Sequence, residues 1–255
     1  MIVTEKEQSF IMVEQHQHAL LSGEFVKAWE ADFFPMEEWR LFVEYAIFQH
    51  DRAWILLDRY PKWNEVEQNP YSFLNYPLED RIRHYQLGID EVEEESIYAA
   101  ILCNLHYTSF FNRDSNDPAI KGFLQSEKIR RIRLSQMLSI DCDSKYVKEH
   151  LDILQFCDDL SLFICMTDLT SNVKENVPWF ANGFKQSFPF TQQKIRADWI
   201  AENEIALSPS PFKGNVTIEV PYKEVSKITI EKLGLKKAWA GTDTQTLSII
   251  IRSMN

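Results

Sequence analysis

The chain has 255 residues, of which 45% are hydrophobic and 25% charged, and these proportions exclude a disordered chain, a collagen-like fibre and a small disulfide scaffold. No stretch reaches the roughly 18 consecutive apolar residues of a membrane-spanning helix, and the acidic start Met1–Glu7 is unlike a signal peptide. The formal charge of −11 argues against nucleic-acid binding, which relies on neutralising phosphates. We therefore expect a cytoplasmic protein without nucleic-acid or membrane partners.

Apolar residues recur at three- and four-residue steps through the first two thirds of the chain, a pattern typical of amphipathic helices. The segment between Pro61 and Pro77 is rich in Asn, Pro and aromatic residues, so we expect an ordered loop there. The predicted helices cover residues 5–31, 36–59, 78–92, 94–111, 118–139 and 145–170.

The pattern changes after Ser171, where prolines and glycines interrupt any helix. Residues 215–220 alternate apolar and polar side chains, and residues 246–251 are rich in β-branched residues, so both runs are predicted strands. The sequence therefore predicts a mainly α fold, with a helical domain over residues 1–172 and a small β-rich segment over residues 173–255 packed on it.

Five side chains from four of the predicted helices are candidate metal ligands. They are His18, His50, Asp51, His106 and Asp158. A carboxylate in the centre of an apolar stripe, such as Asp158, costs several kcal/mol unless it is paired. Imidazole and carboxylate ligands together suit Mn, Fe, Co, Ni or Zn better than Ca. The sequence thus predicts a site for one or two divalent transition-metal ions.

Each of these residues also has a structural interpretation. A single buried histidine is more often a hydrogen-bonded core residue than a ligand, and an adjacent His-Asp pair arises by chance in many chains. Asp158 and Asp159 are also compatible with one buried and one solvated acid on a helix. Asp58 either orients a ligand histidine or is a surface acid at a helix C-terminus. We expect His84 and His150, which lie in charged surroundings, at the surface.

The order His18, His50-Asp51, Asp158 resembles the HD superfamily of metal-dependent phosphohydrolases, which is named for its adjacent His-Asp pair. A closer resemblance, spanning most of the chain, is to an uncharacterised bacterial family catalogued as domain of unknown function three-eight-nine-one (DUF3891). The stretches that carry it are Gln15-His-Gln-His-Ala, His50-Asp-Arg-Ala-Trp with Asp58 and Pro61, Tyr98-Ala-Ala-Ile-Leu-Cys-Asn-Leu-His and Cys157-Asp-Asp-Leu-Ser-Leu.

The HD resemblance implies an HD-like helical bundle in which His18, His50, Asp51 and Asp158 bind metal, with Asp51 bridging the ions if there are two. His106 matches no residue of the minimal pattern, but HD variants with a second metal add histidines from intervening helices. The resemblance also implies that metal-activated water attacks a nucleotide or a small phosphoester. We assign Asp51 and His106 as the catalytic residues.

A phosphorylated substrate needs cationic donors, and four arginines near the His-Asp pair are candidates: Arg52, Arg59, Arg81 and Arg83. We assign Arg52, which follows the pair directly, and Trp54 as substrate-binding residues. Aromatic residues beside this region either stack on a base or sugar or pack a long loop onto the core: Trp54, Tyr60, Trp63, Tyr71, Phe73 and Tyr76.

Two other functions compete with phosphoester hydrolysis. Some HD-like helical enzymes are di-iron oxygenases, and three histidines with two aspartates come near that ligand count. Alternatively, the chain is a non-enzymatic binding or regulatory module, in which His18, His50 and Asp158 pair directly with one another and the basic C-terminal segment is a docking surface. The oligomeric state stays open.

Overall fold

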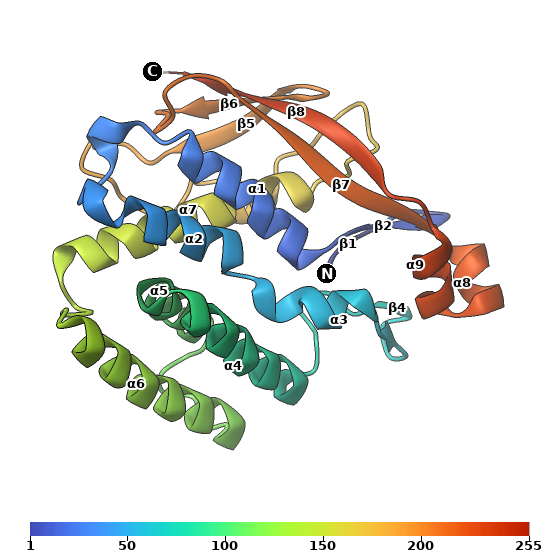
Figure 1. The fold of residues 1–255 in the computed structure, drawn as a ribbon. Helices are drawn as coiled ribbons and strands as arrows, with labels where there is room; N and C mark the ends of the chain where they lie inside the picture. Colours follow the sequence, from blue (N-terminus) through green and yellow to red (C-terminus); the bar gives the residue numbers. More distant parts are fainter. Residues whose placement is uncertain (255) are drawn as a thin grey trace.

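The computed structural model describes residues 1–254, and its largest β element is a curled six-stranded sheet built from both ends of the chain (Figure 1). Its strands are β1 (Ile2–Glu5), β2 (Ser9–Val13), β5 (Arg196–Ala201), β6 (Glu204–Ser208), β7 (Val216–Ser226) and β8 (Gln245–Ser253). They lie in the order β1-β2-β7-β8-β6-β5, and all neighbours are antiparallel except the parallel pair β6 and β8.

Helices cover the concave face of this sheet and continue away from it (Figure 1). They are α1 (Gln15–Lys27), α2 (Arg40–Gln49), α3 (Ile55–Arg59), α4 (Leu78–Glu95), α5 (Ile97–Ser109), α6 (Pro118–Leu138) and α7 (Lys145–Cys165). Helices α8 (Lys227–Leu233) and α9 (Leu235–Gly241) pack with Phe10 and Met12 of β2 in a separate hydrophobic cluster. Helix α1 is central, because it packs against α2, α7 and strand β7. Within residues 1–254, no helix combines the length and the apolar character needed to cross a bilayer.

Short elements complete the chain. They are the 3-10 helices η1 (Ala31–Phe33), η2 (Glu37–Trp39), η3 (Arg52–Trp54) and η4 (Pro178–Phe180) and the two-stranded ribbon of β3 (Trp63–Asn64) and β4 (Asn69–Pro70). Capping side chains fix several helix starts. Ser96 accepts a hydrogen bond from the backbone N–H of Ala99, and Asp117 accepts from Ala119 before Pro118 begins α6.

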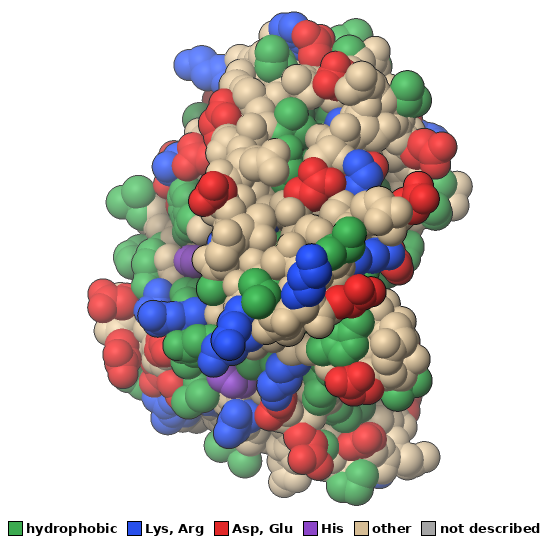
Figure 2. Space-filling view, turned by 90° about the vertical axis from the view of Figure 1, so that its right-hand side faces the viewer, with side chains coloured by type: hydrophobic (Ala, Val, Ile, Leu, Met, Phe, Trp, Pro, Cys, Tyr) green, Lys and Arg blue, Asp and Glu red, His purple; other side chains and the backbone are tan. Residues whose placement is uncertain are grey.

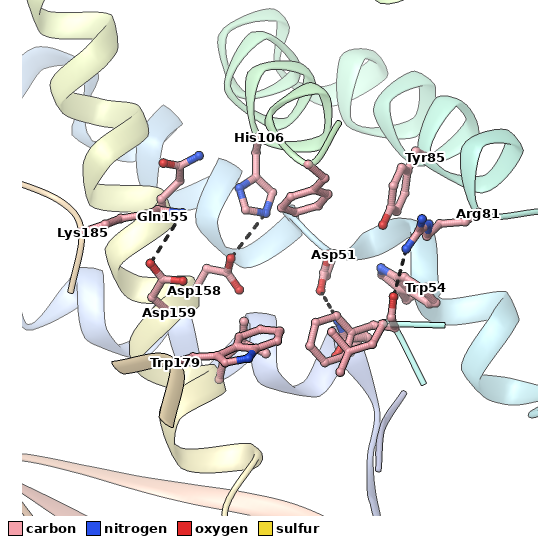
Figure 3. A pocket seen from close by; sticks show the side chains of 15 residues that line it. Asp51, Trp54, Arg81, Tyr85, His106, Gln155, Asp158, Asp159, Trp179 and Lys185 are labelled. Atoms are coloured by element: carbon pink, nitrogen blue, oxygen red, sulfur yellow. Dashed lines mark hydrogen bonds and ion pairs between the residues drawn. The ribbon is translucent and has the colours of Figure 1, made fainter. Parts of the chain in front are cut away.

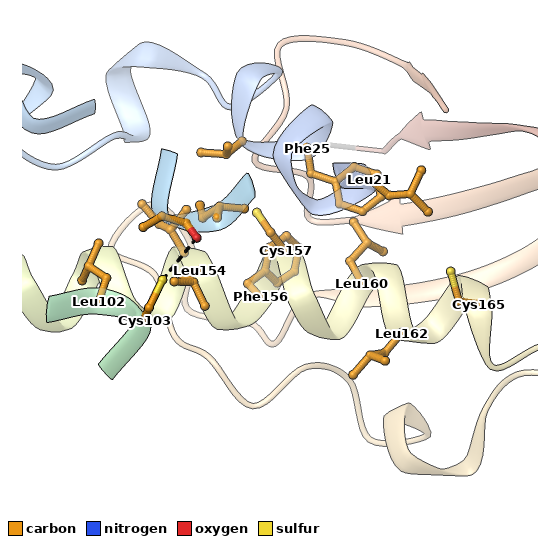
Figure 4. Close-up of a cluster of buried hydrophobic side chains, with 14 of the residues drawn as sticks. Leu21, Phe25, Leu102, Cys103, Leu154, Phe156, Cys157, Leu160, Leu162 and Cys165 are labelled. Atoms are coloured by element: carbon orange, nitrogen blue, oxygen red, sulfur yellow. Dashed lines mark hydrogen bonds between the residues drawn. The ribbon is translucent and has the colours of Figure 1, made fainter. Parts of the chain in front are cut away.

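Helix α7 runs through the hydrophobic core and presents apolar side chains to α1 and α5 (Figure 4). Phe156 and Leu160 are fully buried there, as is Phe25 from α1. Cys103, Cys157 and Cys165 are buried in this core and form no disulfide. Burial raises the pKa of each of these thiols, so they are inert packing residues.

The prediction of a mainly α, HD-like helical bundle with a small β-rich appendage is wrong. About half of the chain is helical, and the sheet is a half-barrel that includes the N-terminal strands. Residues 9–13, predicted as helix, form β2, which is buried at every position and pairs with β7. A short, continuous apolar run has no periodicity that separates a strand from a helix, so the pattern could not reveal it.

The sheet also crosses the predicted boundary between residues 172 and 173. Strands β2 and β7 lie on opposite sides of that boundary in sequence, yet Ser9 lies opposite Ser226 in one antiparallel pair. The C-terminal strands were predicted correctly as elements, since residues 216–226 and 245–253 form β7 and β8. The two segments therefore contribute to one sheet and to one continuous hydrophobic core.

A second difference concerns the predicted helix over residues 36–59. Helix α2 ends at Gln49, and the chain continues through η3 into the short helix α3. Asp51 adopts φ −113° and ψ 24°, outside the helical region. This break separates His50 and Asp51 from the regular helix, and it lets both side chains reach the same centre.

One end of the molecule is richer in basic side chains than the overall charge suggests. In Figure 2, Lys and Arg side chains gather across the middle of the face that carries α8 and α9. Helices α8 and α9 contribute three exposed lysines to this end: Lys232, Lys236 and Lys237.

Gly88 allows helix α4 to lie directly against η3, the segment that follows Asp51. A Cβ atom at Gly88 would lie 2.9 Å from both the backbone nitrogen and the Cβ of Ala53. We therefore expect Gly88→Ala to lower the free energy of unfolding by about 1–3 kcal/mol, because backbone must move. The matched control is Gly122→Ala on α6, where the added methyl meets no atom within 4 Å. Equal urea-unfolding stabilities for the two variants would contradict this close packing.

Candidate metal centre

The five predicted ligands come together from four parts of the fold. His18 lies on α1, His106 on α5 and Asp158 on α7, while His50 and Asp51 occupy the break after α2. They form two overlapping groups whose potential ligand atoms lie within 4.8 Å of one another. One group is His18, His50 and Asp51, and the other is His50, His106 and Asp158. The predicted convergence of these distant side chains is therefore observed.

His50 is oriented by the backbone and presents one ring nitrogen to the centre. Its Nδ1 lies 2.7 Å from the carbonyl oxygen of Ile47, so Nδ1 carries the proton and donates. In the neutral ring, Nε2 then carries a lone pair and can only accept. This nitrogen is buried, has no hydrogen-bond partner and lies 3.5 Å from Asp158 Oδ1. Two acceptors facing each other in the interior require a cation or a proton between them.

The electrostatics of His50 show the same requirement. Burial lowers the pKa of His50, but the nearby carboxylates of Asp158 and Asp51 outweigh burial and raise it to about 9. Burial raises the pKa of Asp158, but the surrounding histidines, His50 foremost, outweigh burial and bring this pKa well below its usual range. Without a metal, the centre therefore holds a proton on His50 beside an ionised Asp158.

His106 faces the same carboxylate from α5. Its Nε2 lies 3.7 Å from Asp158 Oδ2, and both of its ring nitrogens are buried without a hydrogen-bond partner (Figure 3). Burial lowers the pKa of His106 to about 4 despite the opposing charge of Asp158. His106 is thus a neutral imidazole near neutral pH, which is the form that binds metal ions.

His18 makes closer contacts than the other two histidines. Its Nε2 lies 2.7 Å from Asp51 Oδ2, and its Nδ1 lies 2.6 Å from Ser161 Oγ. When Ser161 donates to the carbonyl oxygen of Asp158 at 2.8 Å, His18 Nδ1 must donate to Ser161. Nε2 then directs a lone pair at Asp51, an arrangement that either a bound cation or a second proton on His18 satisfies.

These donors fit a divalent transition metal ion. Three imidazoles and two carboxylates form a mixed nitrogen and oxygen set, which suits Mn, Fe, Co, Ni or Zn. The buried nitrogens of His50 and His106 that lack partners, with Asp158 between them, are the observation that supports the fit. Because Nδ1 of His50 is used by Ile47, His50 supplies one ligand atom and can complete only one of the two groups at a time.

A pocket of about 390 Å³ opens onto this centre (Figure 3). This size is typical of small-molecule sites. Asp51, His106 and Asp158 line it, together with aromatic and apolar side chains and two cations, Arg81 and Lys185. Both residues assigned as catalytic therefore face the pocket.

Only one of the two predicted substrate-binding residues reaches this pocket. Trp54 lines it. Arg52 does not, because its guanidinium pairs with Glu91 and Gln49 on the outer surface. The aromatic cluster divides in the same way: Trp54 and Phe73 line the pocket, whereas Trp63 packs against Phe10 beneath α8 and α9.

Several pocket residues were not predicted as site residues. Gln15 donates from Nε2 to Asp51 Oδ2 at 3.1 Å, and its place one turn before His18 on α1 was the available signal. Asp159 also lines the pocket, where burial and the charge of Asp158 raise its pKa to about 6 against the pull of Lys185. Lys185 and Trp179 come from the irregular segment after α7, which carries no periodic pattern.

Two expectations for residues outside the centre are corrected. His150 is not at the surface: it is buried, its Nε2 donates to the Pro35 carbonyl at 2.8 Å, and its Nδ1 accepts from the Tyr98 hydroxyl at 2.6 Å. Asp58 is also buried, and it neither orients a ligand histidine nor lies at the surface. It accepts the backbone N–H of Gln15 at 2.6 Å and thereby holds the start of α1.

Comparison with known proteins places the chain in a family without assigning an activity. No curated protein and no protein of solved structure matches it. Residues 1–227 match a protein family, which confirms the closer of the two resemblances expected from the sequence. Because this match covers most of the chain, the protein belongs to the family described as "Protein of unknown function (DUF3891)".

Proposed function

We propose that the chain is a metal-dependent phosphohydrolase of HD type, with His18, His50, Asp51, His106 and Asp158 as the residues that hold one or two ions. The observation that carries this proposal is the set of buried ring nitrogens on His50 and His106 that face Asp158 without a hydrogen-bond partner. The order of these residues along the chain resembles the minimal HD pattern, and His106 would add a ligand from an intervening helix.

A divalent ion held by these residues would lower the pKa of its water ligand towards neutrality and would neutralise charge on the phosphoryl oxygens. In the hydrolysis, the water oxygen would bond to phosphorus and give up a proton, the bond from phosphorus to the leaving oxygen would break, and that oxygen would take up a proton to leave as an alcohol. The Ile47 carbonyl fixes the ring of His50, and burial keeps His106 neutral. Asp51 and His106, which line the pocket, stand beside the reacting groups in this proposal.

A di-iron oxygenase is the second candidate. The two overlapping ligand groups favour it, since together they supply three histidines and two aspartates. Oxygen consumption, or an iron absorption band in the purified protein, separates this candidate from a hydrolase.

The non-enzymatic alternative requires direct pairing among His18, His50 and Asp158. His18 does pair directly, though with Asp51. His50 Nε2 and Asp158 Oδ1, however, are 3.5 Å apart, and that nitrogen has no hydrogen-bond partner. In a core built only for internal hydrogen bonding, His50 Nε2 would have a hydrogen-bond partner, because a buried polar atom without a partner costs about 1–3 kcal/mol.

Elemental analysis of protein purified without added metal is the first test. We expect roughly one or two transition-metal ions per chain: His50 completes one group, and a second ion would be held by the remaining ligands of the other group. We also expect hydrolysis of phosphomonoesters to stop after chelation and to return when the same metal is added back. Protein that folds, contains no transition metal and takes up none would rule the proposal out.

A further inference from the structure

Arg81 differs from the other arginines near the centre because it alone lines the pocket. Arg52 pairs with Glu91, Arg83 lies near Asp80, and Arg59 is exposed beside Tyr60. Arg81 has no carboxylate partner within residues 1–254. Its Nη1 donates to the carbonyl oxygen of Phe73 at 3.1 Å, and its Nε is buried without a hydrogen-bond partner. A positioned guanidinium with unused donors is suited to an anionic ligand.

Tyr85 lies one turn after Arg81 on α4 and faces the same space (Figure 3). Its hydroxyl makes no hydrogen bond to residues 1–254, and its ring stacks on Tyr107 with the centroids 4.2 Å apart. Burial raises the pKa of Tyr85 well above its usual range, so the hydroxyl is a proton donor. Figure 3 places Arg81 and Tyr85 together on one side of Asp51, and Lys185 and Asp159 on the other.

The rim of the pocket is apolar and exposed. Leu74, Phe110 and Trp179 line it, although 53%, 49% and 58% of their respective surfaces are accessible. Trp179 comes from η4 and meets Phe73 edge-on, with the ring centroids 6.4 Å apart. Large apolar side chains exposed around a small-molecule pocket are suited to an apolar or aromatic part of the ligand.

The charge of the lining limits how much phosphate the pocket can bind. Within residues 1–254, the only cations in the lining are Arg81 and Lys185, and Lys185 lies 3.9 Å from Asp159 Oδ2. Asp51, Asp158 and Asp159 add three carboxyl groups. One free guanidinium beside a metal centre matches a single phosphoryl group, whereas a di- or triphosphate would leave charge unpaired among carboxylates.

We infer that the substrate is a phosphomonoester with an aromatic leaving group, that Arg81 binds its phosphoryl oxygens, and that the exposed rim at Phe110 and Trp179 binds its ring. This inference rests on the proposed function, because it uses the same metal centre. It adds the substrate class and a phosphate-binding residue, and both are testable without turnover.

Phosphonates are the probes, since their carbon–phosphorus bond resists hydrolysis. Binding of phenylphosphonate and methylphosphonate to the metal-loaded protein is measured by calorimetry. We expect phenylphosphonate to bind wild-type protein at least about 10-fold more tightly, because only its ring contacts the apolar rim. Arg81→Met is expected to weaken both ligands by about 10- to 100-fold, the usual effect of losing a hydrogen bond to a charged group. Methylenediphosphonate should bind no more tightly than methylphosphonate.

Arg83→Met is the matched control, because Arg83 lies two residues away on the same helix with its side chain 68% exposed. It should bind both phosphonates as wild-type protein does. Trp179→Ala should remove most of the preference for phenylphosphonate and leave methylphosphonate binding unchanged. If Arg81→Met does not fold, Arg81→Lys replaces it, with an expected loss of about 10-fold because the forked geometry is absent.

Measuring the metal content of every variant separates a failure of the proposed metal-dependent function from a failure of the inference about the substrate. Wild-type protein that binds no metal would refute the proposed function. Metal-loaded protein in which Arg81→Met and Arg83→Met bind methylphosphonate equally well would overturn the inference and leave the metal centre standing. A methyl ligand that binds as tightly as the phenyl ligand would overturn the aromatic substrate class.

Discussion

Asp158→Asn is expected to weaken metal binding by more than about 100-fold and to abolish metal-dependent hydrolysis. Substituting a residue that only hydrogen-bonds to a metal ligand typically weakens metal binding by about 10- to 100-fold, and substituting a ligand itself should weaken it more. The substitution keeps the shape of the side chain but removes the charge that His50 and His106 face at 3.5 and 3.7 Å. Metal titration of the chelator-treated protein measures the affinity, and hydrolysis of phenyl phosphate measures the activity.

Asp159→Asn is the matched control, since it is the same change one residue along α7. Asp159 lines the pocket but belongs to neither group of potential ligands. It accepts a hydrogen bond from Gln186 Nε2 at 2.8 Å, which an Asn oxygen can still accept. We expect this variant to bind metal as wild-type protein does. Undiminished metal affinity in Asp158→Asn would exclude Asp158 as a ligand.

The second large effect is the pH dependence of the stability of metal-free protein. Burial alone would lower the pKa of His50, but the nearby carboxylates of Asp158 and Asp51 outweigh burial and raise it from 6.5 to about 9. A raised pKa in the folded state stabilises the protein below pH 6.5, and this contribution is lost as the pH rises through 9. The loss is on the order of 3 kcal/mol. We expect urea-unfolding free energies to fall between pH 6.5 and 9.

Other groups change protonation outside that window. Burial lowers the pKa of His106 from 6.5 to about 4. The neutral His106 ring therefore contributes to the free energy of unfolding above pH 6.5, and this contribution is lost as the pH falls from 6.5 towards 4. Metal-loaded protein should not lose stability towards pH 9, because the ion takes the place of the proton on His50. His50→Gln should remove the slope from the metal-free protein. A metal-free protein that becomes more stable from pH 6.5 to 9 would refute the assigned pairing of His50 with Asp158.

The centre was more predictable from sequence than the fold around it. His18, His106 and Asp158 lie on regular helices whose apolar spacing indicates an inward face, so their convergence follows from packing those faces together. His50 and Asp51 also lie at this centre, although the helix that was expected to carry them ends at Gln49. The residue types signalled the site even where the local geometry was different.

The sheet and the pocket wall depended on information that local patterns do not contain. Strand β2 is stabilised by pairing with β7, and no window of neighbouring residues includes both. Similarly, Trp179 and Lys185 reach the pocket from a segment with little regular structure. Arg52 was preferred over Arg81 because it is adjacent to the His-Asp pair in sequence, but the turn of η3 directs it towards Glu91 instead.

The pairing of β2 with β7 has a consequence for the protein during its synthesis. Helix α1 follows β2 directly, so the position of His18 is tied to a strand that leaves the ribosome roughly 200 residues later. Long-range pairing of this kind forms slowly, because a large loop must close first. The nascent chain therefore exposes His18 well before the sheet partner of β2 exists, and the strand that precedes α1 is held in the sheet only after β7 has been synthesised.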